Sequence, residues 1–126
     1  MMKSKSFLGV DFGAGSLKVA EFEPTESGGI CLRAFGSHSL GLAGAQDAAR
    51  EGVVKKAVQT LLAEHGFNTK DINVCAPGFH VFSKFVKLPP VDSSKVTQII
   101  QYEAQQNVPF PLEEVVWDYQ ILGTTS

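Results

Sequence analysis

The sequence contains few metal-ligating side chains and no long hydrophobic run. Its 2 cysteines and 3 histidines are scattered through 126 residues, and none stands in a C-x-x-C or H-x-x-x-H spacing. This scatter does not predict a zinc site, and we expect Cys31 and Cys75 to be reduced thiols buried in two separate strands. No apolar stretch approaches the roughly 20 residues of a membrane-spanning helix. Asp11 interrupts the first apolar segment, which is therefore too short for the hydrophobic region of a signal peptide. We therefore expect a cytoplasmic chain without direct membrane insertion.

An excess of charge of one sign is also missing. The net charge is −2, from 11 basic and 13 acidic residues. This balance supplies no positive field for nucleic acid, so nucleic acid is excluded as the expected partner. Hydrophobic residues make up 44% of the chain and charged residues 19%, which is typical of a globular protein and not of a disordered one. A chain of 126 residues is long enough for one core but not for two large lobes.

Residues 7–22 have the pattern of a strand, a tight glycine turn and a second strand. Gly13 and Gly15 can adopt positive φ and have no side chain, so the backbone amides of the turn can approach a ligand closely. Consecutive amides that point at one place bind an anion such as phosphate. Lys18 would add a positive charge to that phosphate, and Asp11 would orient water around a magnesium ion.

An ordinary β-hairpin is the alternative explanation of the same residues. Glycine turns join many pairs of strands, and an aspartate at a strand end often only caps the turn. The sequence contains neither a G-x-x-x-x-G-K-[ST] loop nor a G-x-G-x-x-G fingerprint, so these two nucleotide motifs are excluded. The spacing Asp11-x-Gly13-x-x-Ser16-x-Lys18 is similar to the first phosphate loop of the actin-like ATPase superfamily.

Hydrophobic periodicity predicts an α/β fold with the order β-β-β-α-β in the first part of the chain. The predicted strands cover residues 7–12, 16–23, 30–39 and 71–76, and the predicted helix covers residues 47–65. Gly66 stands where a helix often ends. We expect the first three strands to form an antiparallel meander and the fourth to pair parallel with them after the helix. This order is the opening of a ribonuclease-H-like lobe.

The rest of the chain predicts a smaller β-α-β segment. Residues 80–88 read as a strand, residues 92–107 as a helix, and residues 115–122 as a second strand that alternates between apolar and polar side chains. Two prolines, Pro109 and Pro111, end the helix. The carboxylates of this segment are better explained by a solvated face than by acid–base catalysis.

Four motifs in this second segment resemble the family of type IV pilus assembly protein PilM. They are Leu88-Pro89-Pro90, Tyr102-Glu103-Ala104, Val108-Pro109-Phe110-Pro111 and Glu114-Val115-Val116-Trp117-Asp118-Tyr119. The resemblance implies an FtsA-like, actin-like fold. In that fold, residues 1–79 form subdomain 1A with the first phosphate loop, and residues 80–126 form part of a small α+β subdomain 1C. It also implies that the whole protein is longer, with a second lobe that this chain lacks.

The resemblance further implies an ATP-binding assembly protein. The whole protein would bind ATP and magnesium, and this chain alone would bind ATP weakly or not at all, because one loop supplies amides from one side only. The implied cofactor-binding residues are Asp11, Gly13, Ala14, Gly15, Ser16 and Lys18, with Asp11 holding magnesium through water. No residue is assigned to catalysis, and any ATPase activity would be weak. The alternatives are an FtsA-like division protein, the cytoplasmic domain of a type II secretion platform protein, and an actin-fold sugar or acetate kinase.

The partner that the resemblance implies is a PilN-like single-pass membrane protein. Its short cytoplasmic N-terminal peptide would dock between subdomains 1A and 1C and recruit the protein to the inner membrane. The second segment has more apolar and aromatic surface than about 45 residues can bury by themselves. We assign the partner site to Phe85, Phe110 and Tyr119, and the alternative is that these side chains are simply core. We also expect an uncovered sheet edge in the incomplete 1C segment, which would allow self-association.

Overall fold

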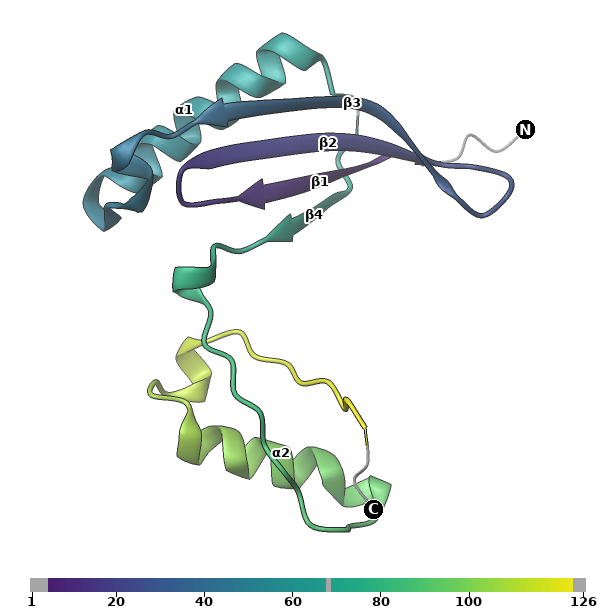
Figure 1. Ribbon diagram of the computed structural model, residues 1–126, viewed down its shortest axis with the longest axis vertical. Helices are drawn as coiled ribbons and strands as arrows, with labels where there is room; N and C mark the ends of the chain where they lie inside the picture. Colours follow the sequence, from purple (N-terminus) through teal and green to yellow (C-terminus); the bar gives the residue numbers. More distant parts are fainter. Residues whose placement is uncertain (1–4, 68, 124–126) are drawn as a thin grey trace. The chain divides into compact units, whose positions relative to one another are not determined.

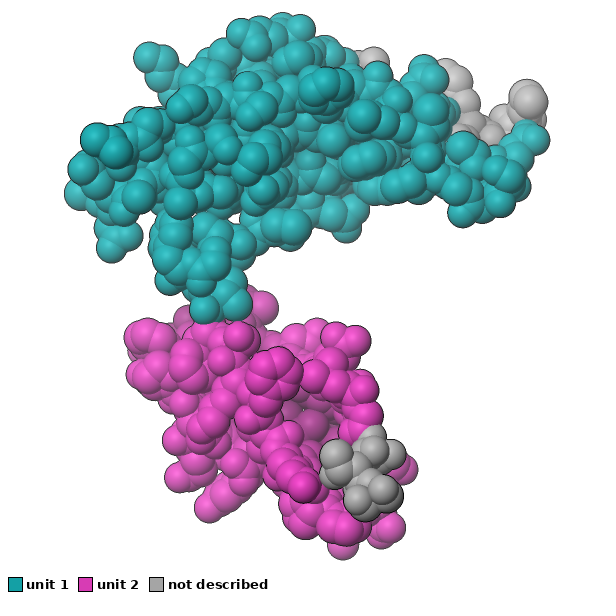
Figure 2. All heavy atoms as spheres, viewed as in Figure 1, with its two compact units in different colours: residues 1–81 teal, residues 82–126 magenta. Residues whose placement is uncertain are grey.

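The structure is a computed structural model, and it describes residues 5–67 and 69–123. Its main elements are β1 (Phe7–Phe12), β2 (Ser16–Pro24), β3 (Ile30–Ser39), α1 (Asp47–His65), β4 (Ile72–Cys75) and α2 (Ser93–Asn107) (Figure 1). Three short 3-10 turns complete them, namely η1 (Leu42–Ala45), η2 (Gly78–His80) and η3 (Leu112–Glu114). The predicted β-β-β-α-β order is confirmed. The chain divides into two compact units, residues 1–81 (unit 1) and residues 82–126 (unit 2) (Figure 2).

One mixed sheet of four strands forms the framework of unit 1. Its strand order is β3-β2-β1-β4. β1 pairs antiparallel with β2 and parallel with β4, and β2 pairs antiparallel with β3. These pairings confirm the predicted meander and the predicted parallel strand after the helix. β1 and β2 are the two inner strands, so the turn between them, residues 13–15, lies at the end of the central hairpin of the sheet.

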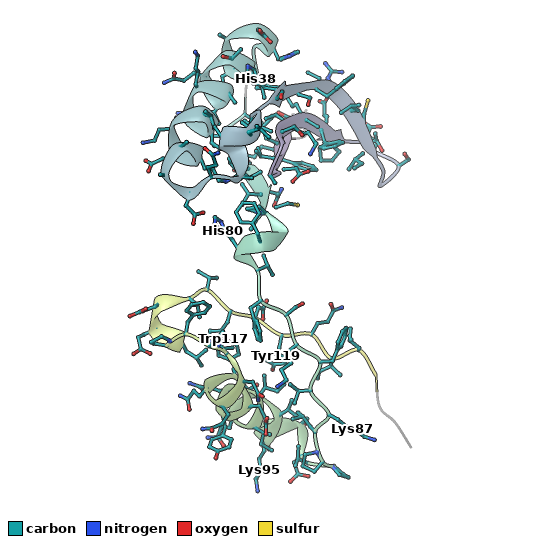
Figure 3. All side chains as sticks on the ribbon, turned by 60° about the vertical axis from the view of Figure 1, so that its left-hand side comes forward. His38, His80, Lys87, Lys95, Trp117 and Tyr119 are labelled. Carbon is teal, nitrogen blue, oxygen red and sulfur yellow. The ribbon has the colours of Figure 1, made fainter. Side chains whose placement is uncertain are left out.

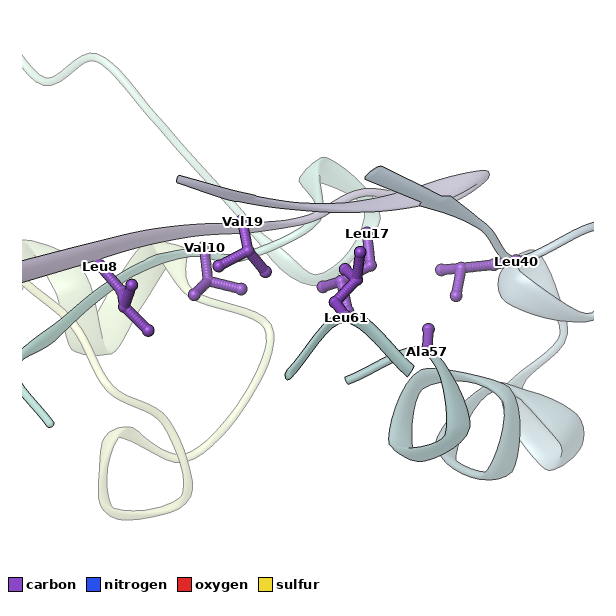
Figure 4. Packing of buried hydrophobic residues seen from close by; sticks show 7 residues of the cluster. All are labelled: Leu8, Val10, Leu17, Val19, Leu40, Ala57 and Leu61. Carbon is purple, nitrogen blue, oxygen red and sulfur yellow. The ribbon is translucent and has the colours of Figure 1, made fainter. Parts of the chain in front are cut away.

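The buried core of unit 1 lies between one face of the sheet and α1 (Figure 4). Its members are Leu8, Val10, Leu17, Val19, Leu40, Ala57 and Leu61. Side chains alternate between the two faces of a strand. The residues next to Val10 and Val19, Asp11 and Lys18, therefore lie on the face opposite α1. This alternation separates the hydrophobic packing of the hairpin from its charged side chains.

The helix α1 begins and ends where the sequence predicts. It spans Asp47–His65 and is followed by Gly66 in the left-handed conformation, with φ of 57°, which glycine adopts without steric cost. α1 packs on β2 and β3. It approaches β3 very closely at Gly36, where an added Cβ would lie 2.9 Å from Cδ2 of Leu61. The glycine in β3 therefore sets how near the helix can come to the sheet.

The prediction that both cysteines are buried is wrong. Cys31 and Cys75 are both exposed. They lie in β3 and β4, which are the two edge strands of the sheet, and Cys75 shares the face of Asp11 because these residues are paired in register. A hydrophobic pattern predicts a strand, but it does not say which face of that strand a helix will cover. Within the described residues of unit 1, no helix covers the face opposite α1.

Unit 2 contains the predicted helix but not the two predicted strands. α2 spans Ser93–Asn107, whereas the described residues of 80–88 and 115–122 form no strand. Alternating side chains favour extended backbone, but a strand also needs a neighbour at hydrogen-bonding distance. Here each segment contacts α2 through side chains, Lys84 with Asn107 and Tyr119 with Thr97. Trp117 and Tyr119 both come from the second extended segment (Figure 3). The expectation of an uncovered sheet edge in this unit is therefore also wrong for residues 82–123.

Candidate functional site

The candidate site is the turn of residues 13–15 together with the two residue pairs that lead into it. Phe12 pairs with Leu17 and Asp11 pairs with Lys18 across the β1–β2 hairpin. The Lys18 Nζ atom donates to Oδ2 of Asp11 at 3.1 Å, and both side chains are about half exposed. An exposed ion pair contributes roughly 0–1 kcal/mol to folding. The pair is therefore available to a ligand at little cost in stability.

The two glycines of the turn do not use positive φ, contrary to expectation. Positive φ occurs among the described glycines at Gly28, Gly41 and Gly66. The requirement for glycine at position 13 is steric instead. A Cβ added there would lie 2.8 Å from the carbonyl oxygen of Ser16 and 3.1 Å from Nζ of Lys18. A Cβ added at Gly15 would meet nothing within 4 Å, so only Gly13 is required by the local packing.

The carbonyl groups on the near side of the turn are held by one arginine. Arg50, in the first part of α1, donates from Nη2 to the oxygen of Phe12 at 3.0 Å and from Nη1 to the oxygen of Gly13 at 2.9 Å. The same Nη1 donates to the oxygen of Gly44 at 2.6 Å. A guanidinium fixes its hydrogens in one plane, so it can hold several carbonyl groups in a fixed geometry.

The far side of the turn is held by the segment that precedes α1. The amide of Leu40 donates to the oxygen of Gly15 at 2.9 Å. The oxygen of Ala14 lies so close to Gly44 that a Cβ added at Gly44 would be 2.2 Å from it. The carbonyl groups of residues 12–15 therefore all face residues 40–50.

The amides of the turn consequently point away from residues 40–50. A trans peptide is planar, with its N–H opposite its C=O, and the described residues contain no cis peptide. Fixing the oxygens of residues 12–14 therefore directs the amides of Gly13, Ala14 and Gly15 outward. Ala14 and Gly15 are exposed, and their amides donate to no acceptor within the described part of the chain. Free, outward-pointing amides beside a lysine are what an anion site requires.

A shallow cavity of about 620 Å³ is lined in part by Arg50. Its lining includes Val54 of α1, Val74 of β4 and Pro77. The acidic groups that line it are Asp47 and Glu51, and the guanidinium beside them already donates to three carbonyl groups. Two carboxylates disfavour an anion. The cavity is therefore a poorer candidate for phosphate than the outward side of the turn.

The comparisons with known proteins identify the family. A sequence profile described as type IV pilus assembly protein PilM matches residues 9–126. The chain belongs to the PilM family. No curated protein matches the chain at a significant level.

Several solved structures resemble part of this PilM-family chain. Two structures of the Ppx/GppA protein from Aquifex aeolicus each match with 13% sequence identity and a TM-score of 0.40. A type II variant of the Aquifex aeolicus Ppx/GppA phosphatase matches with 12% identity and a TM-score of 0.39. In each case the match covers 56% of this chain and 25% of the other. The chain thus spans about a quarter of the length of these proteins, and a likeness at this level carries no argument of its own.

The structure brings together one set of predicted site residues and leaves the other dispersed. The loop set, namely Asp11, Gly13, Ala14, Gly15, Ser16 and Lys18, forms one hairpin end. The partner set is dispersed over unit 2, with Phe85 and Tyr119 in the two extended segments and Phe110 after α2. All three are exposed. The hydroxyl of Tyr119 hydrogen-bonds that of Thr97 at 2.9 Å, and no described contact joins the three aromatic residues.

Arg50 is the site residue that the sequence analysis missed. It occupies the apolar stripe of α1, because it lies three, four and seven positions before Val53, Val54 and Ala57. A charged residue in such a stripe needs a buried partner, and this signal was present in the sequence. The sequence does not indicate which groups Arg50 binds, because Phe12 and Gly13, whose carbonyl groups accept its hydrogen bonds, are 38 and 37 residues away along the chain.

Metal-ligating and membrane-spanning features are absent from the described ranges. Within residues 5–67 and 69–123, no three side chains of His, Cys, Asp or Glu form a group that could hold a metal ion. No helix in the same ranges is both long and apolar enough to cross a bilayer. Asp11 is the one carboxylate within residues 11–18 that could orient water around a metal ion.

Proposed function

We propose that this PilM-family chain supplies the phosphate-binding loop of an ATP site in type IV pilus assembly. The observation that carries the proposal is the orientation of the turn. Residues 40–50 hold its carbonyl groups, and the amides of residues 13–15 point outward near the ammonium of Lys18. These amides, together with the half-exposed ammonium of Lys18 that is paired with Asp11, match the charge and hydrogen-bonding capacity of a terminal phosphate. The guanidinium of Arg50 holds this orientation in the chain without ligand.

Magnesium fits the same loop. Magnesium keeps several waters and is usually held by one or two carboxylates together with the phosphates of its nucleotide. Asp11 offers one half-exposed carboxylate, 3.1 Å from the Lys18 ammonium. When bound, the metal would neutralise phosphate charge. The role of Asp11 would be to orient the waters of that ion, while Lys18 turns from the carboxylate to the phosphate.

We propose an assembly role for the whole protein and not a metabolic phosphotransfer. A kinase needs a carboxylate placed to take a proton from its substrate, and the loop's own carboxylate, Asp11, is paired with Lys18. The nucleotide would instead set the conformation of a scaffold. That scaffold would be cytoplasmic and would bind the short N-terminal peptide of a PilN-like protein in the inner membrane. The exposed aromatic residues of unit 2 support this second part of the proposal.

Calorimetric titration with MgATP tests the nucleotide site. In the longer protein that the family implies, Lys18→Ala and Asp11→Ala should each weaken binding about tenfold, the scale of one lost charge-assisted hydrogen bond. The matched control is Lys55→Ala, which removes an exposed lysine paired with Glu51 on α1 and should leave affinity unchanged. The 126-residue chain alone should give no resolvable heat. Unchanged affinity in both loop variants would mean that the turn is an ordinary hairpin turn that does not bind the nucleotide.

A further inference from the structure

Arg50 is the one buried charged side chain in the described part of the chain, with 9% of its surface exposed. Its hydrogen bonds go to three carbonyl oxygens, and it forms no ion pair with a carboxylate of the described residues. Burying a cation without a counterion is unfavourable unless every donor is satisfied. A leucine at this stripe position would fill the space without that cost. The guanidinium is therefore explained by what it does to the carbonyl groups of the turn and not by packing alone.

The two bonds from Arg50 to Phe12 and Gly13 fix two successive peptide planes. These planes carry the amides of Gly13 and Ala14 on their opposite edges. An anion site whose donors are already oriented binds more tightly, because no ordering is required when the ligand arrives. A single guanidinium behind the turn thus determines where its outward amides point.

The same guanidinium also reaches the turn η2. Its carbon Cζ lies 5.2 Å from the centroid of the Phe79 ring, which is within cation–π distance. Phe79 lies in Gly78–His80 (η2), directly before the last residue of unit 1, Val81. Hydrogen bonds in a chain polarise one another. An anion bound by the amides of the turn would therefore strengthen the hydrogen bonds that Arg50 donates to the carbonyl groups of the same peptides. The contact between Arg50 and Phe79 would change as a result.

We propose that Arg50 is the positioning residue of the phosphate loop and that it couples the loop to η2 through Phe79. The coupling part rests on the proposed function, whereas the positioning part concerns the chain without ligand. Arg50 acts through the backbone of residues 12–14 and makes no contact with the ligand itself. A substitution of Arg50 should therefore change three properties together: the order of the loop, its affinity for an anion and the environment of Phe79.

Nuclear magnetic resonance relaxation of the 126-residue chain tests the positioning part. In Arg50→Met and Arg50→Lys, the order parameters of the Gly13 and Ala14 amides should fall from about 0.85 to below about 0.6. Lysine keeps the charge but cannot donate to two carbonyl groups from one planar group. If the role of Arg50 is purely electrostatic, Arg50→Lys should keep the loop order of the wild type. If Arg50 positions the loop, it should not. The matched control is Arg33→Met, which removes an exposed arginine paired with Glu23. Unchanged loop order in both Arg50 variants would overturn the proposal.

A titration of the same chain with inorganic pyrophosphate tests the coupling. In the wild type, the amide resonances of residues 13–16 and of Phe79 and His80 should shift with one common dissociation constant. In Phe79→Leu the loop should still respond while His80 does not. A loop response without any response at η2 would overturn the coupling. If the wild type does not respond at all but loop order falls in the Arg50 variants, the coupling fails and the positioning role stands. The proposed function is then decided separately, by the MgATP titration of the longer protein.

The wild-type chain supplies a measurement that needs no variant. A guanidinium held by three carbonyl groups rotates and exchanges its protons slowly, so its Nη groups should give separate, slowly exchanging resonances. This measurement tests the positioning role of Arg50 even if both Arg50 variants fail to fold. One averaged Nη resonance in the wild type would overturn the positioning role.

Discussion

At the scale of single residues, the hairpin turn shows that its two glycines are not equivalent. Gly13 is enclosed by the Ser16 carbonyl group and the Lys18 ammonium, whereas Gly15 faces open space. Neither has positive φ, so conformational freedom does not account for either of them. The spacing of the motif marks both positions, but the contacts distinguish the required glycine from the permitted one.

Replacing each glycine by alanine separates the two cases. Gly13→Ala should destabilise the chain by about 1–3 kcal/mol, because its Cβ would lie 2.8 Å from a backbone oxygen that can move only with the hairpin. Gly15→Ala is the matched control and should be neutral or stabilising by about 0.4–1 kcal/mol, because it restricts the unfolded chain without a clash. Urea denaturation measures both changes. Equal effects of the two substitutions would contradict the steric assignment of Gly13.

At the scale of elements, the position of α1 determines the site. The helix is held against the sheet by Leu61 and Ala57, and its first part carries Arg50 to the turn. Adjacent leucines at its C-terminal end have opposite environments. Leu61 is 1% exposed and Leu62 is 48% exposed. The sequence placed both in the apolar stripe, and only the packing shows which one faces the sheet.

Truncating these leucines tests the packing of α1. Leu61→Ala should lower the free energy of unfolding by about 2–5 kcal/mol, since it removes a fully buried side chain and leaves a cavity. Leu62→Ala, with the same change in composition and helix propensity, should cost less than about 1 kcal/mol. Thermal denaturation followed by circular dichroism gives both values. A cost at Leu62 as large as that at Leu61 would mean that α1 is rotated about its axis relative to this structure.

At the scale of the whole molecule, the two units differ in how they are stabilised. All of the buried hydrophobic residues belong to unit 1, and no residue of 82–123 is buried. Unit 2 exposes several large apolar side chains, among them Phe85 at 87% and Phe110. Exposed apolar surface can mark an interaction site where its residues form a contiguous patch. The proposal that unit 2 binds the partner of the whole protein rests on these exposed side chains.

Peptide titration of the longer protein tests that placement. The partner's N-terminal peptide should bind at least tenfold more weakly to Phe85→Ala, Phe110→Ala and Tyr119→Ala, because aromatic anchors dominate such interfaces. The matched control is Tyr102→Ala, which removes another exposed aromatic residue, located on α2. Melting temperatures of all four variants show whether each remains folded. Binding equal to that of the wild type in all three, with folding intact, would contradict the placement.

The sequence by itself determined the order of the elements and the position of the loop. Hydrophobic periodicity and glycine placement located β1, β3 and α1 at their observed bounds, because these signals arise from local backbone geometry. The spacing from Asp11 to Lys18 identified the hairpin turn for the same reason. The motifs after Leu88 led to the family that the comparison then showed.

The tertiary structure alone decided how these elements serve the site. It placed Arg50 against the carbonyl groups of Phe12 and Gly13, left both cysteines exposed on the edge strands, and gave the extended segments of unit 2 no strand partners. Each of these features depends on which residues meet across a long separation in the chain. Periodicity reports the direction of a side chain within its own element, but it does not report what lies opposite that side chain.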